Sequence, residues 1–215
     1  ISDEKICVPG ISLTQRDRDT DNVYLGYSSP RTPSRVYLYN LLTKSKKLVK
    51  EQEIPSGHNS NDYIVERIEY QSHDGRLVPL TITRHKKTKI DGTANLLLYG
   101  YGSYGSSMSP NFSSTRLSLI DRDIIWATAH IRGGMEKGMK WWKEGKLTNK
   151  KNTFEDYIFA AKYLIHHKYS SKGKIIGMGG SAGGLLMGAV VNQAPELFLG
   201  IIMAVPFVDS LTTNL

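Results

Sequence analysis

The sequence predicts an α/β fold built around a mostly parallel sheet, and three observations support this. Residues 95–99, 123–130 and 200–205 are continuous apolar runs with the length of strands buried on both faces. Residues 152–168 carry apolar side chains at helical spacing, as expected of a crossover helix between parallel strands. Residues 174–191 have the pattern of a short strand, a glycine-rich turn and an apolar helix. This alternation is typical of a sheet covered by helices.

The beginning of the chain has the pattern of a separate, all-β unit. Residues 22–29, 35–40 and 47–50 have the pattern of short strands separated by polar turns. This rhythm is typical of one blade of a β-propeller, which needs neighbouring blades to cover its faces. We therefore expect residues 1–52 to be the final strands of a propeller and residues 53–62 to be a linker.

A β-hairpin is predicted next, followed by the parallel strands and their helix. Residues 63–71 and 77–84 alternate apolar and polar side chains, and residues 73–75 supply the turn between them. The long predicted helix has a cap signal at its start. We expect Thr153 to cap this helix, with Asp156 three residues later completing a capping box.

The most specific motif is the G-x-S-x-G stretch at residues 179–183, which places Ser181 between a predicted strand and a predicted helix. An α/β-hydrolase uses this context to lift a serine hydroxyl above the sheet, and the first N–H groups of the helix can stabilise a negative oxygen. The alternative is an ordinary glycine-rich turn that contains a serine. We favour an α/β-hydrolase catalytic domain at residues 63–215, as the amino-terminal two-thirds of that fold without its last strands, with Ser181 as nucleophile.

A second glycine-rich stretch, at residues 100–105, follows a predicted strand with the spacing G-x-G-x-x-G. A dinucleotide-binding turn needs an apolar helix directly after it, whereas residues 106–114 are polar and include a proline. The dinucleotide interpretation is disfavoured, and we expect no cofactor. A hydrolase places its second oxyanion donor in this loop, where the phenol of Tyr101 could supply it. The alternative is that Tyr101 and Tyr104 are packing aromatics in a kinked turn.

The sequence does not complete a catalytic triad. The order in α/β-hydrolases is Ser, then Asp or Glu, then His, and no histidine follows Ser181. Asp209 is the only later acid with a plausible topology. His130 could line the site, although a structural role is favoured. His166 and His167 close the long helix, where positive charge is favourable, and adjacent helix residues diverge by about 100°, so they cannot chelate one metal ion together.

Composition disfavours several function classes. The chain has 28 basic and 20 acidic residues, and its basic runs are not interleaved with stacking aromatics, so we expect solvated basic surfaces and no nucleic-acid partner. Cys7 is the only cysteine, which excludes an internal disulfide and fits a reducing, cytoplasmic compartment. We see no signal peptide, membrane span or metal-ligand spacing, and expect neither a membrane partner nor a metal.

Four segments of the chain recur, in the same order, in one known family of enzymes. They are Leu98-Tyr99-Gly100-Tyr101-Gly102-Ser103-Tyr104-Gly105, His130-Ile131-Arg132-Gly133-Gly134, Lys151-Asn152-Thr153-Phe154-Glu155-Asp156-Tyr157 and Gly179-Gly180-Ser181-Ala182-Gly183-Gly184. Together they resemble the prolyl oligopeptidase family of serine peptidases. The Y-G-S-Y-G and G-S-A-G-G phrases, with V-P-F-V-D at residues 205–209, are most similar to its oligopeptidase B (protease II) branch.

The resemblance implies a serine-type oligopeptidase that hydrolyses short peptides after Arg or Lys through an acyl-enzyme. By this resemblance Ser181 is the nucleophile, and the N–H of Ala182 and the hydroxyl of Tyr101 form the oxyanion hole. Tyr104 is expected near the wall of the primary specificity pocket. The family's propeller caps the active site and admits only short peptides.

The resemblance also implies that some essential groups are not in this sequence. The family's triad Asp and His, and the carboxylates of its specificity pocket, fall beyond Leu215, so Asp209 is not the expected triad acid. We therefore expect the chain alone to be inactive. Its implied partner is the remainder of the propeller and the hydrolase domain, in the parent chain or on a second polypeptide.

Residues 109–111 depart from the family pattern. Bacterial relatives often carry acidic residues at this point, where they help to hold a second basic residue of the substrate. Ser109 and Asn111 stand there in this chain. We expect both to contact substrate, but the sequence does not support a preference for paired basic residues.

Two other functions stay open at this point. A carboxylesterase or lipase would share the serine turn, but it would not explain the propeller-like strands of residues 1–52. A non-catalytic remnant that only binds or scaffolds would be favoured if Ser181 were buried and misplaced.

Overall fold

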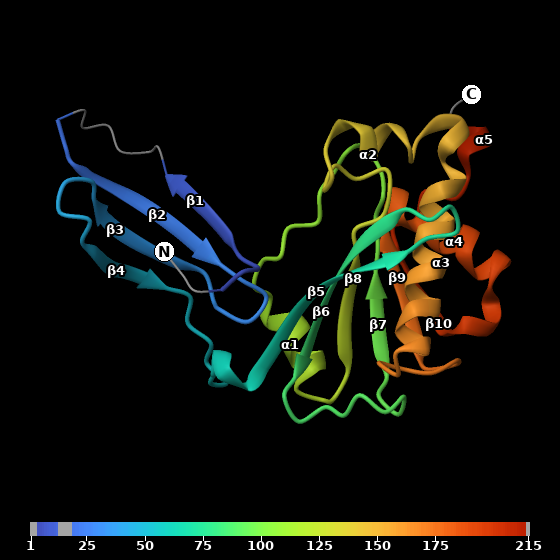
Figure 1. Ribbon diagram of the computed structural model, residues 1–215, viewed down its shortest axis with the longest axis horizontal. Coiled ribbons are helices and arrows are strands. Elements are labelled where there is room, and N and C mark those ends of the chain that lie inside the picture. Colours follow the sequence, from blue (N-terminus) through green and yellow to red (C-terminus); the bar gives the residue numbers. More distant parts are fainter. Residues whose placement is uncertain (1–3, 13–18, 214–215) are drawn as a thin grey trace.

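The computed structural model describes residues 4–12 and 19–213, which form two sheets joined by a short linker (Figure 1). A four-stranded sheet lies on one side, and a six-stranded sheet with helices on both faces lies on the other. The mixed α/β architecture is the one predicted. The division into residues 1–52, 53–62 and 63–215 as propeller, linker and catalytic domain stays a prediction.

The four-stranded sheet is an antiparallel meander whose strands are adjacent in chain order. Its strands are β1 (Val8–Ser12), β2 (Asn22–Ser28), β3 (Arg35–Asn40) and β4 (Lys46–Glu51). β2, β3 and β4 follow the predicted ranges, whereas β1 was not predicted. Its sequence contains Pro9 and Gly10, which are both disfavoured in strands. Gly10 is nevertheless paired with Gly26 of β2, so the ladder continues without side chains at this point.

The six-stranded sheet has the order β10-β9-β7-β8-β6-β5. Its strands are β5 (Tyr63–Gln71), β6 (Leu77–His85), β7 (Leu96–Tyr99), β8 (Ile125–Ala129), β9 (Ile175–Gly180) and β10 (Phe198–Ala204). β5 and β6 form the predicted hairpin, and β6 pairs antiparallel with β8. β8, β7, β9 and β10 are parallel, so their carboxyl ends meet at one edge of the sheet.

Helices cover both faces of this sheet. They are α1 (Ser114–Ile120), α2 (Met139–Lys143), α3 (Lys151–His166), α4 (Ala182–Gln193) and α5 (Ser210–Thr213), with short 3-10 turns η1 (Ser60–Asp62), η2 (Leu147–Asn149) and η3 (Pro195–Leu197). α3 and α4 bury the main core on one face, and α1 covers the other with Leu117 and Ile120. The alternation of β8 suits this arrangement, because Ile125 joins the main core and Trp126 the smaller cluster. No helix among the described residues could span a bilayer.

The start of α3 corrects one prediction. Thr153 is not the cap, because the helix begins at Lys151 and the Thr153 hydroxyl donates to the carbonyl oxygens of Arg132 and Gly145, at 2.8 and 3.2 Å. Asp156 does not complete a capping box either, since its carboxylate forms a buried ion pair with Arg132. Hydrogen bonds to Arg132 and Gly145, which lie between β8 and α3, therefore replace the helix cap that the local sequence predicts.

Candidate active site

Ser181 lies between the last residue of β9 and the first of α4, as predicted. Its backbone has φ +53° and ψ −120°, a conformation that non-glycine residues adopt only under strain. Neighbouring backbone holds it there: its N–H donates to the Ala204 carbonyl at 2.9 Å, and its carbonyl accepts from Gly184 and Phe207. The residue is exposed. The fold thus presents the serine at the carboxyl edge of the sheet instead of burying it.

The glycines around Ser181 are required by close backbone approaches. A Cβ on Gly179 would lie 2.3 Å from the carbonyl oxygen of Gly183, and one on Gly184 would lie 2.4 Å from the Cβ of Pro206. A Cβ on Gly183 would lie 3.0 Å from the carbonyl oxygen of Gly100. The turn can form only because these side chains are absent, which is why the motif is recognisable in the sequence.

The same packing brings the 100–105 loop to the first turn of α4. The Cα of Tyr101 and one edge of its ring lie within 3.5 Å of the position a Cβ on Gly183 would take. Ala182 is in that first turn, where backbone N–H groups have no acceptor within the helix. The three predicted site residues Ser181, Ala182 and Tyr101 therefore lie at the amino-terminal end of α4. A backbone N–H at a helix start and a phenol are both hydrogen-bond donors of the kind that can stabilise an oxyanion.

Tyr104 follows in the same loop and extends into solvent. It has φ +58° and is 77% exposed, an unusual combination for a large aromatic residue. Ser109 and Asn111 are also exposed. Their segment is held at both ends, because the Met108 N–H donates to Glu136 at 2.9 Å and the Phe112 N–H donates to Ser28 of β2 at 3.0 Å. The structure thus leaves all three predicted substrate-binding side chains accessible.

His130 is buried and is held through both ring nitrogens. Nε2 lies 2.8 Å from the Thr81 hydroxyl and Nδ1 lies 3.4 Å from a carboxylate oxygen of Glu136. Burial lowers the pKa of His130. Burial also raises the pKa of Glu136, but hydrogen bonds from His130 and Met108 outweigh this and keep it below its ordinary value. This environment agrees with the structural role favoured for His130.

A buried arginine that the sequence motif did not explain supports the loop. The Arg132 guanidinium makes two hydrogen bonds to Asp156, at 2.9 and 2.6 Å, and two more to Asp74. Burial lowers the pKa of Arg132, but the two carboxylates outweigh this and raise it. The next residue, Gly133, has φ +100°, and a Cβ there would lie 2.0 Å from the Gly102 carbonyl oxygen. The ion pairs thus anchor the turn against which the Tyr101 loop packs.

Tyr157 of α3 supports both glycine-rich stretches from below. Its buried hydroxyl donates to the Leu98 carbonyl at 2.5 Å and accepts from the Met178 N–H at 3.3 Å, which ties β7 to β9. Its ring fills the space in front of Gly100, where a Cβ would lie 2.7 Å from a ring carbon. Burial raises its pKa far above the ordinary value, so the hydroxyl stays protonated. The helical spacing of residues 152–168 does not predict this hydrogen bonding.

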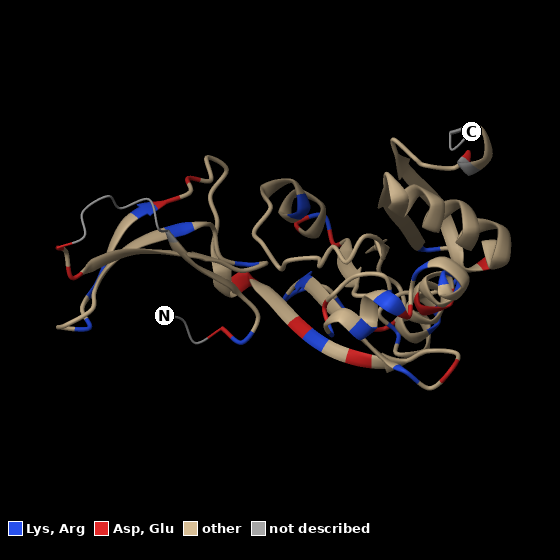
Figure 2. Cartoon of the chain, turned by 90° about the horizontal axis from the view of Figure 1, so that it is seen from above, with Lys and Arg blue, Asp and Glu red and all other residues tan. Residues whose placement is uncertain are grey.

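Lys150 also contacts the 100–105 loop. Its ammonium donates to the Gly102 carbonyl at 2.6 Å and to the Ser103 hydroxyl at 2.9 Å, and burial lowers its pKa to about 8. Sequence reasoning missed this residue because it belongs to a lysine-rich run, 143–151, that was interpreted as solvated surface. Elsewhere the basic residues are spread over both sheets and interspersed with acidic ones (Figure 2).

Asp209, the later acid considered for a triad, has a local role in the described structure. Its carboxylate accepts hydrogen bonds from the backbone N–H of Thr212, at 3.1 Å, and from the Thr212 hydroxyl. These bonds cap the short helix α5, and hydrogen bonding to Thr212 lowers the pKa of Asp209. His166 and His167 end α3, as predicted, with their rings in edge-to-face contact.

The comparisons with known proteins agree with this geometry. Residues 110–215 match the sequence model described as the prolyl oligopeptidase family. Dipeptidyl aminopeptidase BI of Pseudoxanthomonas mexicana is 45% identical over 215 residues, and protease 2 of Moraxella lacunata is 42% identical over 203 residues. These alignments cover 100% and 94% of the chain but 30% and 29% of the relatives. The chain therefore spans less than a third of their length.

Solved structures show the same likeness. Oligopeptidase B from Leishmania major superimposes with a TM-score of 0.90 at 39% identity, over 99% of this chain and 30% of that one. Oligopeptidase B from Trypanosoma brucei, solved with covalently bound antipain, gives a TM-score of 0.92 at 37% identity over the same shares. The two sheets and the loops between them thus have counterparts in complete members of one group of enzymes.

Proposed function

The chain belongs to the prolyl oligopeptidase family, and from this premise we propose that it carries the nucleophile and oxyanion site of a serine peptidase. The observation that carries the proposal is the exposed, strained Ser181 at the turn from β9 to α4, with Tyr101 packed against the first turn of that helix. A buried or displaced serine would have favoured the non-catalytic remnant.

In the proposed reaction, the Ser181 oxygen attacks the carbonyl carbon of a peptide bond. The new C–O bond gives a tetrahedral intermediate, whose negative oxygen accepts hydrogen bonds from the Ala182 N–H and the Tyr101 hydroxyl. A histidine base takes the serine proton and returns it to the leaving amine, which leaves an acyl-enzyme that water hydrolyses.

The histidine of this scheme is proposed to come from outside the chain. No histidine follows Ser181 in the sequence, and the ring nitrogens of His130 already contact Thr81 and Glu136. We therefore propose that a longer polypeptide or a second one supplies the base, and that the 215-residue chain alone does not hydrolyse peptides. A serine hydroxyl without a base is a weak nucleophile at neutral pH.

The proposed substrates are short peptides cleaved after Arg or Lys. Support comes from the likeness to protease 2 and to the two oligopeptidase B structures, and from the propeller-like four-stranded sheet. The exposed Ser109 and Asn111 would line the path of the neighbouring substrate residue. Since neither carries a charge, no preference for paired basic residues is proposed. A cytoplasmic location also stays a prediction.

A fluorophosphonate probe tests the nucleophile. In the polypeptide that carries this chain together with a triad histidine, we expect labelling of Ser181 that is lost in Ser181→Ala. The 215-residue chain, folded as judged by circular dichroism, should not react at a comparable rate. Absence of labelling in the complete polypeptide would overturn the proposal and favour the non-catalytic remnant. Hydrolysis of short esters without peptides would favour the esterase alternative.

A second mode of cleavage is raised by the relative named dipeptidyl aminopeptidase BI, which is 45% identical to the chain. An enzyme that removes dipeptides needs a free amino terminus, whereas an endopeptidase does not. Arg-containing peptides with a free and an acetylated amino terminus separate the two modes. We expect both to be cleaved, and cleavage of the free peptide alone would replace the endopeptidase proposal by the dipeptidyl one.

A further inference from the structure

We propose that Lys150 is a positioning residue, whose ammonium group holds the 100–105 loop so that Tyr101 reaches the oxyanion. This inference rests on the proposed function, because the loop matters for turnover only if Tyr101 is an oxyanion donor. In this inference Lys150 does not touch the reacting atoms and acts through the loop.

The contacts of Lys150 fall at the centre of the loop. The Gly102 carbonyl, which accepts from the ammonium at 2.6 Å, belongs to the residue directly after Tyr101. The Ser103 hydroxyl, at 2.9 Å, belongs to the residue directly before Tyr104. One side chain thus fixes the backbone between the two tyrosines. Gly102 has φ +67°, a conformation that favours glycine. The backbone at this residue therefore has no side chain of its own to hold it.

The base of Lys150 is rigid. Its N–H donates to the Leu147 carbonyl of η2, and its carbonyl accepts from the Thr153 N–H of α3, each at 3.0 Å. Thr153 is in turn bonded to Arg132, so the base of the lysine side chain is tied to the network that supports the other side of the loop. A side chain with such a fixed base can hold a partner in place more accurately than a surface lysine can.

The surroundings of Lys150 do not have the form of a stabilising ion pair. Its two acceptors are neutral oxygens, whereas Arg132 nearby is paired with two carboxylates. The 100–105 loop carries Tyr101 and Tyr104, and the residues next to Lys150 along the chain include Lys146, Lys151 and Glu155. Burial of a charge between neutral groups is unfavourable for folding, and it lowers the pKa of Lys150 to about 8. A charged side chain held in such surroundings points to a functional role.

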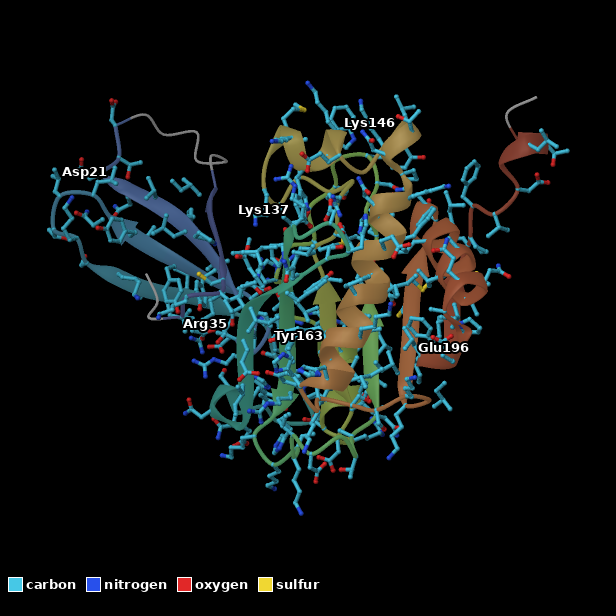
Figure 3. All side chains as sticks on the ribbon, turned by 45° about the vertical axis from the view of Figure 1, so that its right-hand side comes forward. Asp21, Arg35, Lys137, Lys146, Tyr163 and Glu196 are labelled. Carbon is cyan, nitrogen blue, oxygen red and sulfur yellow. The ribbon has the colours of Figure 1, made fainter. Side chains whose placement is uncertain are left out.

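The Lys150 ammonium also lies 6.0 Å from the centroid of the Phe154 ring, and two neighbouring lysines of the same run have other surroundings. Lys146, at the upper end of the molecule beside α2, has its ammonium 3.5 Å from the centroid of the Trp142 ring (Figure 3). Lys151 is exposed and follows Lys150 directly. It therefore provides a matched control with the same chemistry, the same helix end and no hydrogen bond to the described loop.

The activity test uses the complete, active polypeptide with Lys150→Met, Lys150→Arg and the control Lys151→Met. We expect Lys150→Met to lower kcat by at least about tenfold with little change in KM, because small misplacements of a catalytic group are costly. The wild-type kcat should fall as pH rises through about 8, where Lys150 loses its proton. This fall should be absent in Lys150→Arg, which keeps its charge and restores part of the kcat at pH 7.

A second measurement does not depend on activity. In the 215-residue chain, amide hydrogen exchange at Gly105 and Ser106 should be faster in Lys150→Met than in Lys151→Met, because their N–H groups donate to the carbonyls of Gly133 and Ser103 at 2.9 and 3.0 Å. The free energy of unfolding of the wild type should rise, relative to Lys150→Met, between pH 8 and the ordinary lysine pKa of 10.5, because the unfolded chain binds the extra proton there. The two curves should be parallel below pH 8.

The outcomes separate this inference from the proposed function. If the wild type is active but Lys150→Met keeps its kcat and pH profile, the positioning role is wrong while the peptidase proposal stands. If the complete wild type neither cleaves peptides nor is labelled at Ser181, the peptidase proposal and a catalytic role for Lys150 fail together. Unchanged exchange at Gly105 and Ser106 would overturn the structural part of the inference in either case.

Discussion

At the scale of single residues, the candidate site is built from backbone conformations that ordinary residues avoid. Ser181 and Tyr104 both have positive φ angles, +53° and +58°, although neither is a glycine. Such strain persists only where the surrounding structure enforces it, and it concentrates at functional sites. At Ser181 the enforcing groups are the carbonyl of Ala204 and the N–H groups of Gly184 and Phe207. Both strained residues were singled out by the sequence motifs.

The hydroxyl of Tyr101 can be tested by removing a single oxygen. In the complete enzyme we expect Tyr101→Phe to lower kcat by about 100-fold with a small change in KM, because the lost hydrogen bond forms mainly in the transition state. Tyr99→Phe, a change of the same size at the end of β7, is the control and should leave kcat unchanged. Equal kcat values for the two variants would show that Tyr101 is a packing aromatic, which is the alternative from sequence.

At the scale of elements, α3 is the support on which both glycine-rich stretches rest. One side of this helix presents Thr153, Asp156 and Tyr157, which bind the Arg132 turn and the strands β7 and β9. Lys150 adds a contact at the start of the same helix. This 16-residue helix is packed on the sheet, and it thus fixes the loops that carry the proposed chemistry relative to the core.

The Arg132–Asp156 pair should dominate the stability of this support. We expect Asp156→Asn to lower the free energy of unfolding by about 3 kcal/mol, because it leaves a buried guanidinium with one carboxylate fewer. Glu69→Gln, which breaks the exposed Lys137–Glu69 pair, should cost no more than about 0.5 kcal/mol. Urea unfolding followed by tryptophan fluorescence measures both. A loss for Asp156→Asn as small as that for Glu69→Gln would contradict the role assigned to the pair.

At the scale of the whole molecule, the four-stranded sheet and the loop that follows β2 are held to the linker and to the segment before α1 by specific hydrogen bonds. The Phe112 N–H donates to the Ser28 hydroxyl at 3.0 Å, and a ring nitrogen of His58 lies 2.7 Å from the Arg31 carbonyl. His58 also stacks on Tyr63, with ring centroids 5.2 Å apart. Because Phe112 follows Asn111 directly, the placement of the first sheet bears on the proposed substrate-binding segment.

This coupling predicts a local effect of a distant substitution. In Ser28→Ala the Phe112 N–H loses its acceptor, and we expect its amide exchange to rise by about fivefold, the equivalent of one ordinary hydrogen bond. Ser34→Ala, at an exposed position of the same sheet, is the control and should have no effect. Exchange at Phe112 that matches the wild type in both variants would show that the two sheets are not coupled through this bond.

Much of the fold was predictable because it depends on neighbours in the chain. The strands β5 to β10, the helices α3 and α4 and the serine turn follow from apolar periodicity and from glycines that local crowding requires. The shorter elements were missed for physical reasons. α1 and α2 have only seven and five residues, too few to establish a helical period, and β1 contains Pro9 and Gly10.

The sequence by itself determined the element types and the candidate nucleophile, since the glycines that the turn at Ser181 requires are its neighbours in the chain. Tertiary structure decided which polar side chains support that turn. Asp156 pairs with Arg132, 24 positions away, and Lys150 binds Gly102, 48 positions away. Such partnerships depend on how helix and sheet pack, because a lysine or aspartate has the same local signal whether it meets water or a buried partner.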